Sequence, residues 1–394
     1  MSMFEYFPDN YVWNLAVDIA IESGAQIGEI DEMCRPLRAA AAEGRKLTSE
    51  DFLERWVSMA DKLVDLAAED EFRGRNFSAG TKLQRASLYY TTAERMQGQG
   101  SAARVETFRR AQETFQRAMQ LGGENCRRVV IPYSDSFIPG LVTHATDPSG
   151  RTPWVVYVNG LDSCKELLYW SGLPQALARR GVSTLCVDQP GTGEALRVNG
   201  LHLTHEAEKW ATPIYEWLAV RPEVDARRVG MVGISLGGYF VPRAMAFEPR
   251  FAAGAVWGAN HDWAEVQQRR VRKEGENPVP HYWEHVRWVF GAKDMPDFLE
   301  KAKGMCLDGI LEKIRVPFLV THGARDRQIS VEYAQRTYEQ LTNSPRRELK
   351  IFSDREGGVE HVGVDNMSYG RDYIADFLAE ALRGANLPSI NKHS

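Results

Sequence analysis

The sequence has neither a long apolar segment nor an excess of positive charge. No run of apolar residues approaches the 18 that a membrane-spanning helix needs, so we expect no association with a membrane. The formal net charge is −5 at pH 7, which argues against the basic surface that nucleic-acid-binding proteins present. With 43% hydrophobic and 26% charged residues, the composition is typical of a globular protein.

Cysteine is scarce, and its spacing carries no motif. The five cysteines are far apart, with no CxxC pair and no cluster with histidine. This spacing excludes a disulfide framework and a zinc site, so we expect reduced thiols in a cytoplasmic protein without a bound metal or other cofactor. The opening stretch MSMFEYFPDNYVW also lacks the basic and apolar regions of a signal peptide, and we expect none.

The first part of the chain has helical periodicity. Apolar residues recur at helical spacing in 52–67, 83–96 and 105–122. Capping residues precede the first of these segments at 48–51, and a pair of glycines ends the third at 122–123. No second copy occurs at a fixed period, which argues against a helical repeat protein. We therefore predict an N-terminal helical cap or lid domain over residues 1–125.

From residue 126 onward the pattern changes to strands that alternate with amphipathic segments. A β-hairpin is expected around Asp135 and Ser136. Six further apolar segments follow: 153–160, 182–189, 228–235, 251–259, 316–323 and 347–353. Continuous apolar strands alternating with helices indicate an α/β fold, a mostly parallel sheet with helices on both faces. We assign residues 126–385 to this core and 386–394 to a flexible tail.

One connection in the core is too long for a simple crossover. About 55 residues, rich in aromatic and basic side chains, separate the apolar segment 251–259 from the segment 316–323. Structureless loops of that length are rare inside compact domains. We expect an inserted helical cap at about 260–310.

A Gly-x-Ser-x-Gly pattern centred on Ser235 is the first catalytic signal. The pattern alone is weak, because a glycine-rich turn explains it equally well in a chain with 33 glycines. Here it follows the apolar segment RVGMVG and precedes the helical segment YFVPRAMAFE. This strand–turn–helix order is what a nucleophile elbow requires, and the pattern predicts that Ser235 is a nucleophile.

A serine nucleophile needs a base and an acid, which in this arrangement follow it in the order Asp or Glu, then His. Only His361 and His393 come after the last suitable acid, and His393 lies in the terminal tail. His361 lies in a loop with glycines after the last strand, and Asp326 lies just beyond the segment 316–323. The alternatives are an exposed loop histidine and a capping or ion-pairing aspartate. We predict the triad Ser235, Asp326 and His361.

The oxyanion formed during attack on a carbonyl needs two backbone N–H donors. The residue after the nucleophile, Leu236, supplies one of them in an elbow of this kind. The second is expected from the loop at 159–164, where Gly160 lets the backbone turn and Leu161 is the candidate donor. A plain strand-to-helix turn is the alternative.

The segment DQPGTGE, at 188–194, resembles the D-x-P-G-x-G loop of α/β-hydrolases. Together with GISLGGY and the two helical regions, it resembles the branch that contains bacterial dihydroxypseudooxynicotine hydrolase and fungal polyketide chain-shortening hydrolases of pigment and melanin pathways. The resemblance covers residues 126–385 by motif and the N-terminal region by architecture. It implies a homodimeric hydrolase of secondary metabolism that cleaves a C–C bond next to a carbonyl, in a 1,3-diketone or acyl-phenol. An ester- or lactone-cleaving enzyme, an acyltransferase and a non-catalytic binding protein are the alternatives.

Cleavage of a C–C bond requires that the departing carbon be protonated or its charge delocalised. The resemblance implies an extra acidic group near the start of the cap, where Glu265 is the candidate and Asp262 the second choice. Both could instead be solvated carboxylates at a helix start. Cap aromatics are expected to contact an aromatic substrate, although such residues more often belong to a core. The candidate pocket residues are Gly160, Trp263, Trp283 and Trp288.

Overall fold

The computed structural model describes residues 4–8, 10–146, 148, 150–273 and 281–383. The predicted tail at 386–394 and residues 274–280 of the predicted insertion lie outside the described residues. Eight strands form one sheet in the order β1-β2-β4-β3-β5-β6-β7-β8. Their bounds are β1 (Arg127–Tyr133), β2 (Ser136–Thr143), β3 (Thr152–Val158), β4 (Ser183–Val187), β5 (Val224–Ile234), β6 (Gly254–Trp257), β7 (Phe318–Gly323) and β8 (Arg347–Phe352).

The sheet is antiparallel only at one edge. β1 pairs with β2, and β2 pairs with β4, in antiparallel register. All other neighbours are parallel, including the central pair of β3 and β5. The α/β fold expected from the sequence, a mostly parallel sheet preceded by a helical region, is confirmed.

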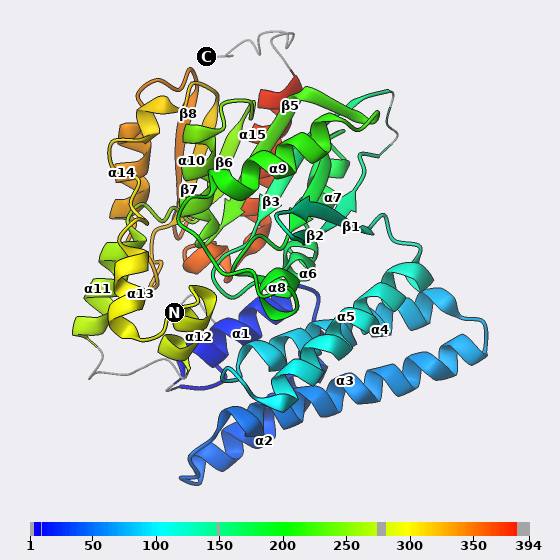
Figure 1. The fold of residues 1–394 in the computed structure, drawn as a ribbon. Helices are drawn as coiled ribbons and strands as arrows, with labels where there is room; N and C mark the ends of the chain where they lie inside the picture. The colour runs from blue at the N-terminus through cyan, green and yellow to red at the C-terminus, as the bar shows by residue number, and fades with distance from the viewer. Residues whose placement is uncertain (1–3, 9, 147, 149, 274–280, 384–394) are drawn as a thin grey trace.

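Helices cover both faces of the sheet, as continuous apolar strands require. On β3, Trp154, Val156 and Val158 point to one hydrophobic core, while Val155 and Tyr157 point to another on the opposite face. The helices of the core domain are α6 (Lys165–Trp170), α7 (Leu173–Ala178), α8 (Gly193–Arg197), α9 (Glu208–Ala219), α10 (Gly237–Phe247), α14 (Glu332–Gln340) and α15 (Met367–Arg383). α9 and α10 pack on the first face, and α6, α7 and α15 on the second (Figure 1).

One amphipathic segment of the core forms two helices instead of one. The segment 167–180 has continuous amphipathic character, but the structure divides it into α6 and α7. Gly172 lies between them with φ of 76°, a left-handed conformation that ends one helix and lets the next start in a new direction.

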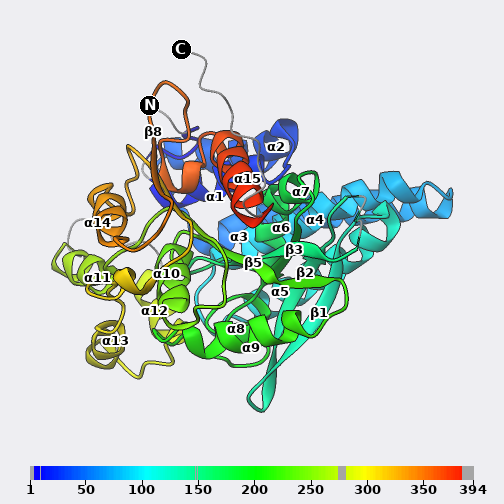
Figure 2. The ribbon, with the colours of Figure 1, turned by 90° about the horizontal axis from the view of Figure 1, so that it is seen from above.

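Two helical regions lie at the carboxyl end of the sheet. The first consists of α1 (Tyr11–Glu22), α2 (Ile27–Ala42), α3 (Ser49–Phe72), α4 (Asn76–Arg95) and α5 (Ala102–Gly122), of which α3, α4 and α5 form a long antiparallel layer (Figures 1 and 2). The second follows β6 and contains α11 (Trp263–Arg272), α12 (Tyr282–Val289) and α13 (Met295–Ala302). No helix among the described residues is long and apolar enough to cross a membrane. Both regions lie on the same side of the molecule, below the sheet in the view of Figure 1.

Candidate active site

Ser235 lies at a sharp turn between β5 and α10. Its φ is +57°, a left-handed conformation that is uncommon for a residue with a side chain. The turn depends on its small neighbours, because a Cβ on Gly233 would lie 2.3 Å from the carbonyl oxygen of Gly237. The turn therefore holds the Ser235 hydroxyl above the carboxyl end of the sheet, in the arrangement of a nucleophile elbow.

His361 and Asp326 form a hydrogen-bonded chain with Ser235. Ser235 Oγ lies 2.9 Å from His361 Nε2, and His361 Nδ1 lies 2.7 Å from Asp326 Oδ2. An ionised carboxylate can only accept, so Nδ1 carries the ring proton and Nε2 is free to accept from the serine hydroxyl. The structure thus brings together the three residues predicted from the sequence, from loops far apart in the chain.

The Asp326 carboxylate is buried and fully hydrogen-bonded. Burial by itself would raise the pKa of its carboxyl, but the neighbouring His361 outweighs burial and the pKa is lowered. Oδ1 accepts from the backbone N–H groups of Gln328 and Ile329, at 2.7 and 2.9 Å. Below it, burial lowers the pKa of His322, whose ring bonds to backbone groups on both sides. These contacts keep Asp326 ionised and fix its orientation toward His361.

Two backbone N–H groups close to Ser235 have no hydrogen-bond acceptor in the part of the chain that the structure describes. The N–H of Leu236, at the start of α10, and that of Leu161, after β3, make no hydrogen bond among the described residues. Gly160 comes so close to the nucleophile that a Cβ there would lie 2.9 Å from Ser235 Cβ. The loop carrying Leu161 therefore passes directly over the nucleophile, and a side chain at 160 would push it away.

The segment 188–194 holds the loop at 159–164 in place by hydrogen bonds. Gln189 and Asn159 exchange two hydrogen bonds, Asn159 N to Gln189 Oε1 at 3.1 Å and Gln189 Nε2 to Asn159 O at 3.0 Å. Asp188 accepts from the backbone N–H of Lys165 at 2.6 Å, and the fully buried Lys165 ammonium bonds back to Asp188 and to Glu194. The D-x-P-G-x-G pattern thus acts by holding the loop at 159–164, an effect that the motif alone does not reveal.

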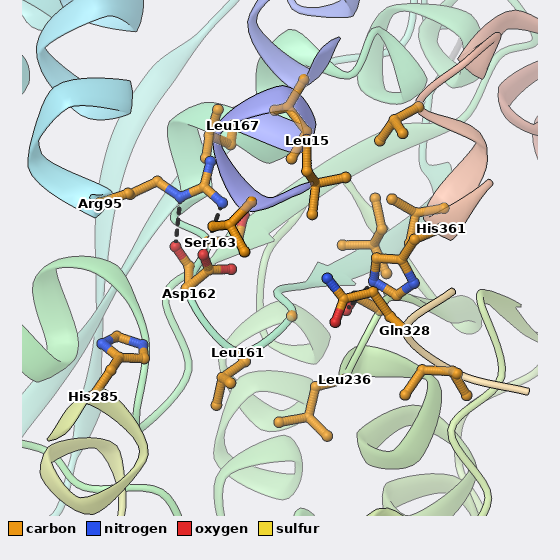
Figure 3. Close-up of a pocket in the computed structure, with 18 of the residues that line it drawn as sticks. Leu15, Arg95, Leu161, Asp162, Ser163, Leu167, Leu236, His285, Gln328 and His361 are labelled. Atoms are coloured by element: carbon orange, nitrogen blue, oxygen red, sulfur yellow. Dashed lines mark hydrogen bonds and ion pairs between the residues drawn. The ribbon is translucent and has the colours of Figure 1, made fainter. Parts of the chain in front are cut away.

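A cavity of about 210 Å³ opens above Ser235 and His361. Its wall comes from the core loops, from the insertion and from the N-terminal helices, including Val12, Trp13 and Leu15 of α1 (Figure 3). Most of the surface of the wall is apolar, as in most small-molecule sites, although polar side chains such as Arg95, Gln267 and His285 are interspersed in it. The contribution of α1 had no signal in the sequence, because an amphipathic helix does not reveal which partner its apolar face meets.

The two cap helices each turn one face to the cavity. On α11, Trp263, Val266, Gln267 and Arg270 line it, at the spacing of one helical face. On α12 the lining residues are Tyr282 and His285, three positions apart. Of the predicted pocket residues, Gly160 and Trp263 lie at the cavity; Trp263 is stacked on Phe290, with ring centroids 5.5 Å apart.

The predicted cap carboxylates are not brought to the cavity. Glu265 lies on the opposite side of α11 from Trp263, where it accepts from Tyr333 Oη at 2.9 Å and from Arg269 at 2.6 Å. Asp262 caps α11, its Oδ1 accepting from the Glu265 N–H at 2.8 Å. Helix geometry explains the outcome, because positions 263 and 265 differ by about 200° around the axis.

Trp283 and Trp288 also lie outside the cavity wall. Trp283 packs against Phe298 of α13, with ring centroids 6.2 Å apart. The ring of Trp288 lies under the guanidinium groups of Arg104 and Arg197, at 4.9 and 5.6 Å. Both aromatic residues therefore hold the cap against its neighbours.

A polar pair at the edge of the cavity had no signal in the sequence. Arg95, at the end of α4, donates from Nε to the backbone carbonyl of Asp162 and from Nη2 to its carboxylate, both at 2.9 Å (Figure 3). Burial alone would raise the pKa of Asp162, but the charge of Arg95 outweighs it and the pKa is about 2. His285 faces the same region; burial and the charge of Arg104 lower its pKa to about 4, so it is neutral at pH 7. A long-range pair of this kind becomes visible only when α4 is placed against the core.

Beside this pair lies a buried ion cluster that joins the helical region to the core. Glu94 of α4 accepts from Arg104 Nε at 2.6 Å and from Arg197 Nε at 2.8 Å. Burial alone would raise the pKa of Glu94, but Arg197 and Arg104 hold it at about 2. The carboxylate is therefore ionised throughout the physiological range and shared between two guanidinium groups.

Within the described residues, one group brings three possible metal ligands together. Single ligand atoms of Asp262, Cys306 and Asp308 lie within 4.8 Å of one another. The carboxylates already have partners: Asp262 caps α11, and Asp308 accepts from His261 at 2.9 Å and from Gln340 at 2.7 Å. The carboxylates of this group are therefore occupied by structural hydrogen bonds outside the cavity, and we assign no metal to it.

Comparison with known proteins places the chain among hydrolases. The profile of the FrsA-like esterase family matches residues 52–266, and that of the prolyl oligopeptidase family matches residues 171–384. Hydrolase LUC6 of Fusarium sp is 27% identical over 90% of this chain and 93% of its own length. The 20-hydroxy-prefusarin hydrolase FUS2 of Gibberella moniliformis is 27% identical over 85% of this chain and 87% of its own length.

A bacterial relative resembles the chain in sequence and in fold. The 2,6-dihydropseudooxynicotine hydrolase of Paenarthrobacter nicotinovorans is 24% identical over 82% of this chain and 83% of its own length. The crystal structure of a 2,6-dihydroxy-pseudo-oxynicotine hydrolase superposes with a TM-score of 0.74 at 22% identity, covering 93% of this chain and 95% of that one. The shared fold therefore includes the helical regions as well as the sheet.

Proposed function

Because the chain belongs to the α/β-hydrolase superfamily, we propose that it is a serine hydrolase that cleaves a C–C bond next to a carbonyl. The substrate class is a 1,3-diketone or acyl-phenol, of polyketide or other aromatic origin. One observation carries the proposal: the hydrogen-bonded chain from Ser235 through His361 to Asp326 opens into a mainly apolar cavity closed by two helical regions. The relatives named as hydrolases of 20-hydroxy-prefusarin and 2,6-dihydropseudooxynicotine support the choice of substrate class.

In the proposed reaction Ser235 Oγ attacks the substrate carbonyl while its proton passes to His361 Nε2. The N–H groups of Leu236 and Leu161 stabilise the oxyanion of the tetrahedral intermediate. The C–C bond then breaks, and its electron pair leaves on a carbon whose charge spreads into an enol or a phenol ring. His361 returns its proton to that carbon. Water, deprotonated by the same histidine, releases the acyl group from Ser235 as a carboxylic acid, and Ser235 recovers its proton.

The roles of the other residues follow from this sequence of steps. Asp326 keeps the His361 ring in the tautomer that can accept the serine proton and stabilises the imidazolium that forms. Burial of the substrate under the helical regions excludes water while the carbanion-like group is protonated. The proposed chemistry requires neither a metal nor an organic cofactor.

Incubation of the purified protein with acetylnaphthols and aryl 1,3-diketones, followed by mass spectrometry, tests the proposal. We expect the acyl fragment to be released as a carboxylic acid and the aromatic fragment to gain a hydrogen. Ser235→Ala, which keeps the cavity and removes the nucleophile, should yield neither product. Hydrolysis of p-nitrophenyl esters by the same protein, with all acetylnaphthols and diketones intact, would contradict C–C cleavage.

Ester hydrolysis is the second candidate, because the FrsA-like esterase profile covers the nucleophile region. A lactonase or an acyltransferase would use the same nucleophile on an oxygen leaving group. Hydrolysis of p-nitrophenyl esters at rates far above those for ketones would favour this group of activities. A binding protein without catalysis would show no labelling of Ser235 by a fluorophosphonate.

We also propose, from the family resemblance, that the protein is a cytoplasmic homodimer. Analytical ultracentrifugation of the purified chain tests the dimer, since a single species at the mass of the monomer would contradict it. Fractionation of the source cells tests the location.

A further inference from the structure

Asp162 is the one carboxylate among the described residues that line the cavity. The wall contains several apolar side chains, some amides and histidines, and two arginines, but the acidic groups of the cap point elsewhere. Asp162 directly follows Leu161, so it lies beside the N–H group proposed to bind the oxyanion. A group on the substrate close to the reacting carbonyl would therefore meet this carboxylate.

The Asp162 carboxylate is held in place, but only one of its two oxygens accepts a hydrogen bond. Arg95 donates one hydrogen bond to the backbone carbonyl of Asp162 and one to its Oδ2. Oδ1 receives no hydrogen bond from any described residue. The side chain is 44% accessible although Arg95 is only 6% accessible, because Asp162 faces the cavity (Figure 3). With its pKa at about 2, the group is an anion that can only accept. The cavity therefore contains an oriented anionic acceptor, one oxygen of which has no donor among the described residues.

The charges around Asp162 determine which donors suit it. Three buried guanidinium groups, those of Arg95, Arg104 and Arg197, stand against two carboxylates, those of Glu94 and Asp162. With His285 neutral, the cluster has one positive charge in excess. An excess positive charge in a buried site repels an ammonium group. A neutral hydroxyl, above all an acidic one such as an enol or a phenol, is the donor that fits.

We propose that Asp162 binds a hydroxyl group of the substrate through Oδ1, and that the substrate is therefore a hydroxylated acyl compound, an enol or a phenol. This inference rests on the proposed function, for which it names the chemical group that is recognised. Arg95 acts through Asp162 and is a positioning residue. The hydrogen bond from a phenolic or enolic O–H to a carboxylate draws electron density onto the substrate oxygen and into the ring or double bond.

The same contact assists bond cleavage. Electron density that the substrate oxygen gives to the ring or double bond raises the basicity of the departing carbon, which takes the proton from His361 as the C–C bond breaks. The Asp162 carboxylate keeps its charge throughout and no proton passes to it in the net reaction. Its low pKa suits this role, because a carboxylate that took up the proton would compete with the carbon.

Binding to a protein that cannot turn over the ligand tests the proposal independently of the reaction. Acetylnaphthalenes that carry a hydroxyl at successive ring positions, and their methyl counterparts of similar volume, are titrated into Ser235→Ala by calorimetry. We expect at least one hydroxyl isomer to bind about 10-fold more tightly than its methyl counterpart. In Ser235→Ala combined with Asp162→Asn, that preference should fall below about 3-fold, because a charged acceptor becomes a neutral one.

Two controls make the outcome specific. Asp376→Asn breaks an Asp–Arg pair on the surface, where Asp376 accepts from Arg180 Nε at 2.6 Å, and should leave the preference unchanged. Asp162→Glu keeps the charge and should retain part of the preference, which also covers the case in which the Asn variant does not fold.

A preference absent from Ser235→Ala, or one that survives Asp162→Asn, would overturn the inference. Tighter binding of an aminomethyl analogue, a cation, than of the hydroxyl would overturn it as well. Failure of C–C cleavage with an intact hydroxyl preference would refute the proposed reaction alone.

Discussion

Arg95 holds Asp162 by two hydrogen bonds of 2.9 Å, one to the backbone carbonyl and one to the carboxylate. The donor belongs to α4 and the acceptor to the loop after β3, so the contact ties the helical region to the loop that passes over Ser235. The position of the Leu161 N–H therefore depends on a residue 66 positions earlier in the chain. The helical region shapes the catalytic loop as well as covering it.

Arg95→Lys should lower the turnover number by roughly 10- to 100-fold, with a smaller change in KM. A lysine ammonium keeps the charge but cannot make both bonds with the planar geometry of a guanidinium, so the loop loosens. Steady-state kinetics on an acetylnaphthol or, if esters are the substrates, a p-nitrophenyl ester checks this. Arg109→Lys on the exposed side of α5 is the matched control and should behave as the wild type.

Ser235→Ala and His361→Ala should each remove nearly all turnover, by roughly 10⁴-fold or more, because the two residues act as one unit. Ser235→Ala should leave the unfolding midpoint nearly unchanged, whereas His361→Ala should lower it, because the buried Asp326 carboxylate loses its partner. Fluorophosphonate labelling of the wild type, lost in Ser235→Ala, measures the nucleophile directly. Turnover by Ser235→Ala near the wild-type rate would mean that another group attacks the substrate.

Asp326→Asn should cost less than loss of the serine, roughly 10²- to 10⁴-fold in turnover. The amide can still orient the ring, but it can donate to Nδ1 and so favour the tautomer that cannot accept the serine proton. Turnover equal to that of the wild type would show that another carboxylate serves His361. The pH–rate profile of the variant, measured beside the wild type, separates a change of tautomer from loss of the fold.

Gly160→Ala should lower turnover by at least 10-fold, because the new methyl group would lie 2.9 Å from Ser235 Cβ and displace the loop. Gly28→Ala is the matched control: Gly28 lies within α2, and a Cβ there would meet nothing within 4 Å. That variant should keep full activity and gain up to about 1 kcal/mol of stability, as expected for alanine in a helix. Equal activities of the two variants would contradict the close approach at 160.

Glu94→Gln should destabilise the fold by roughly 3 to 5 kcal/mol, because two buried guanidinium groups lose their shared anion. The effect should depend on pH. The pKa of Glu94 is about 2 in the fold against an ordinary value of 4.5, so its contribution is complete above about pH 4.5 and lost as the pH falls toward 2. By linkage the lost contribution is about 3 kcal/mol. Urea unfolding at several pH values measures it as the difference between wild type and variant; a difference that does not shrink below pH 4.5 would contradict this account.

The sequence predicted those features that depend on local pattern. Some of these features are contiguous in the chain, such as the glycines at 233 and 237 and the apolar strands between helices. Others depend on order along the chain, such as Ser235 followed by Asp326 and then His361. The cap helix α11 contains a local pattern of this kind as well. The spacing of the apolar residues Trp263 and Val266 indicates the face that lines the cavity, and Glu265 does not share that face. What no local pattern contains is the approach of distant segments, such as α4 to the loop at 159–164.

The sharing of Glu94 between the two parts of the molecule bears on how such enzymes are assembled and engineered. One guanidinium partner, Arg104, comes from the helical region, and the other, Arg197, from α8 of the core. A core expressed alone would leave Arg197 facing solvent without its anion and would lack one wall of its cavity. A helical region grafted from a relative would have to supply an acid at the position of Glu94. The N-terminal helices are therefore not an interchangeable module, and exchange of substrate preference between relatives is better sought by changing residues on α1, α11 and α12 than by swapping the whole region.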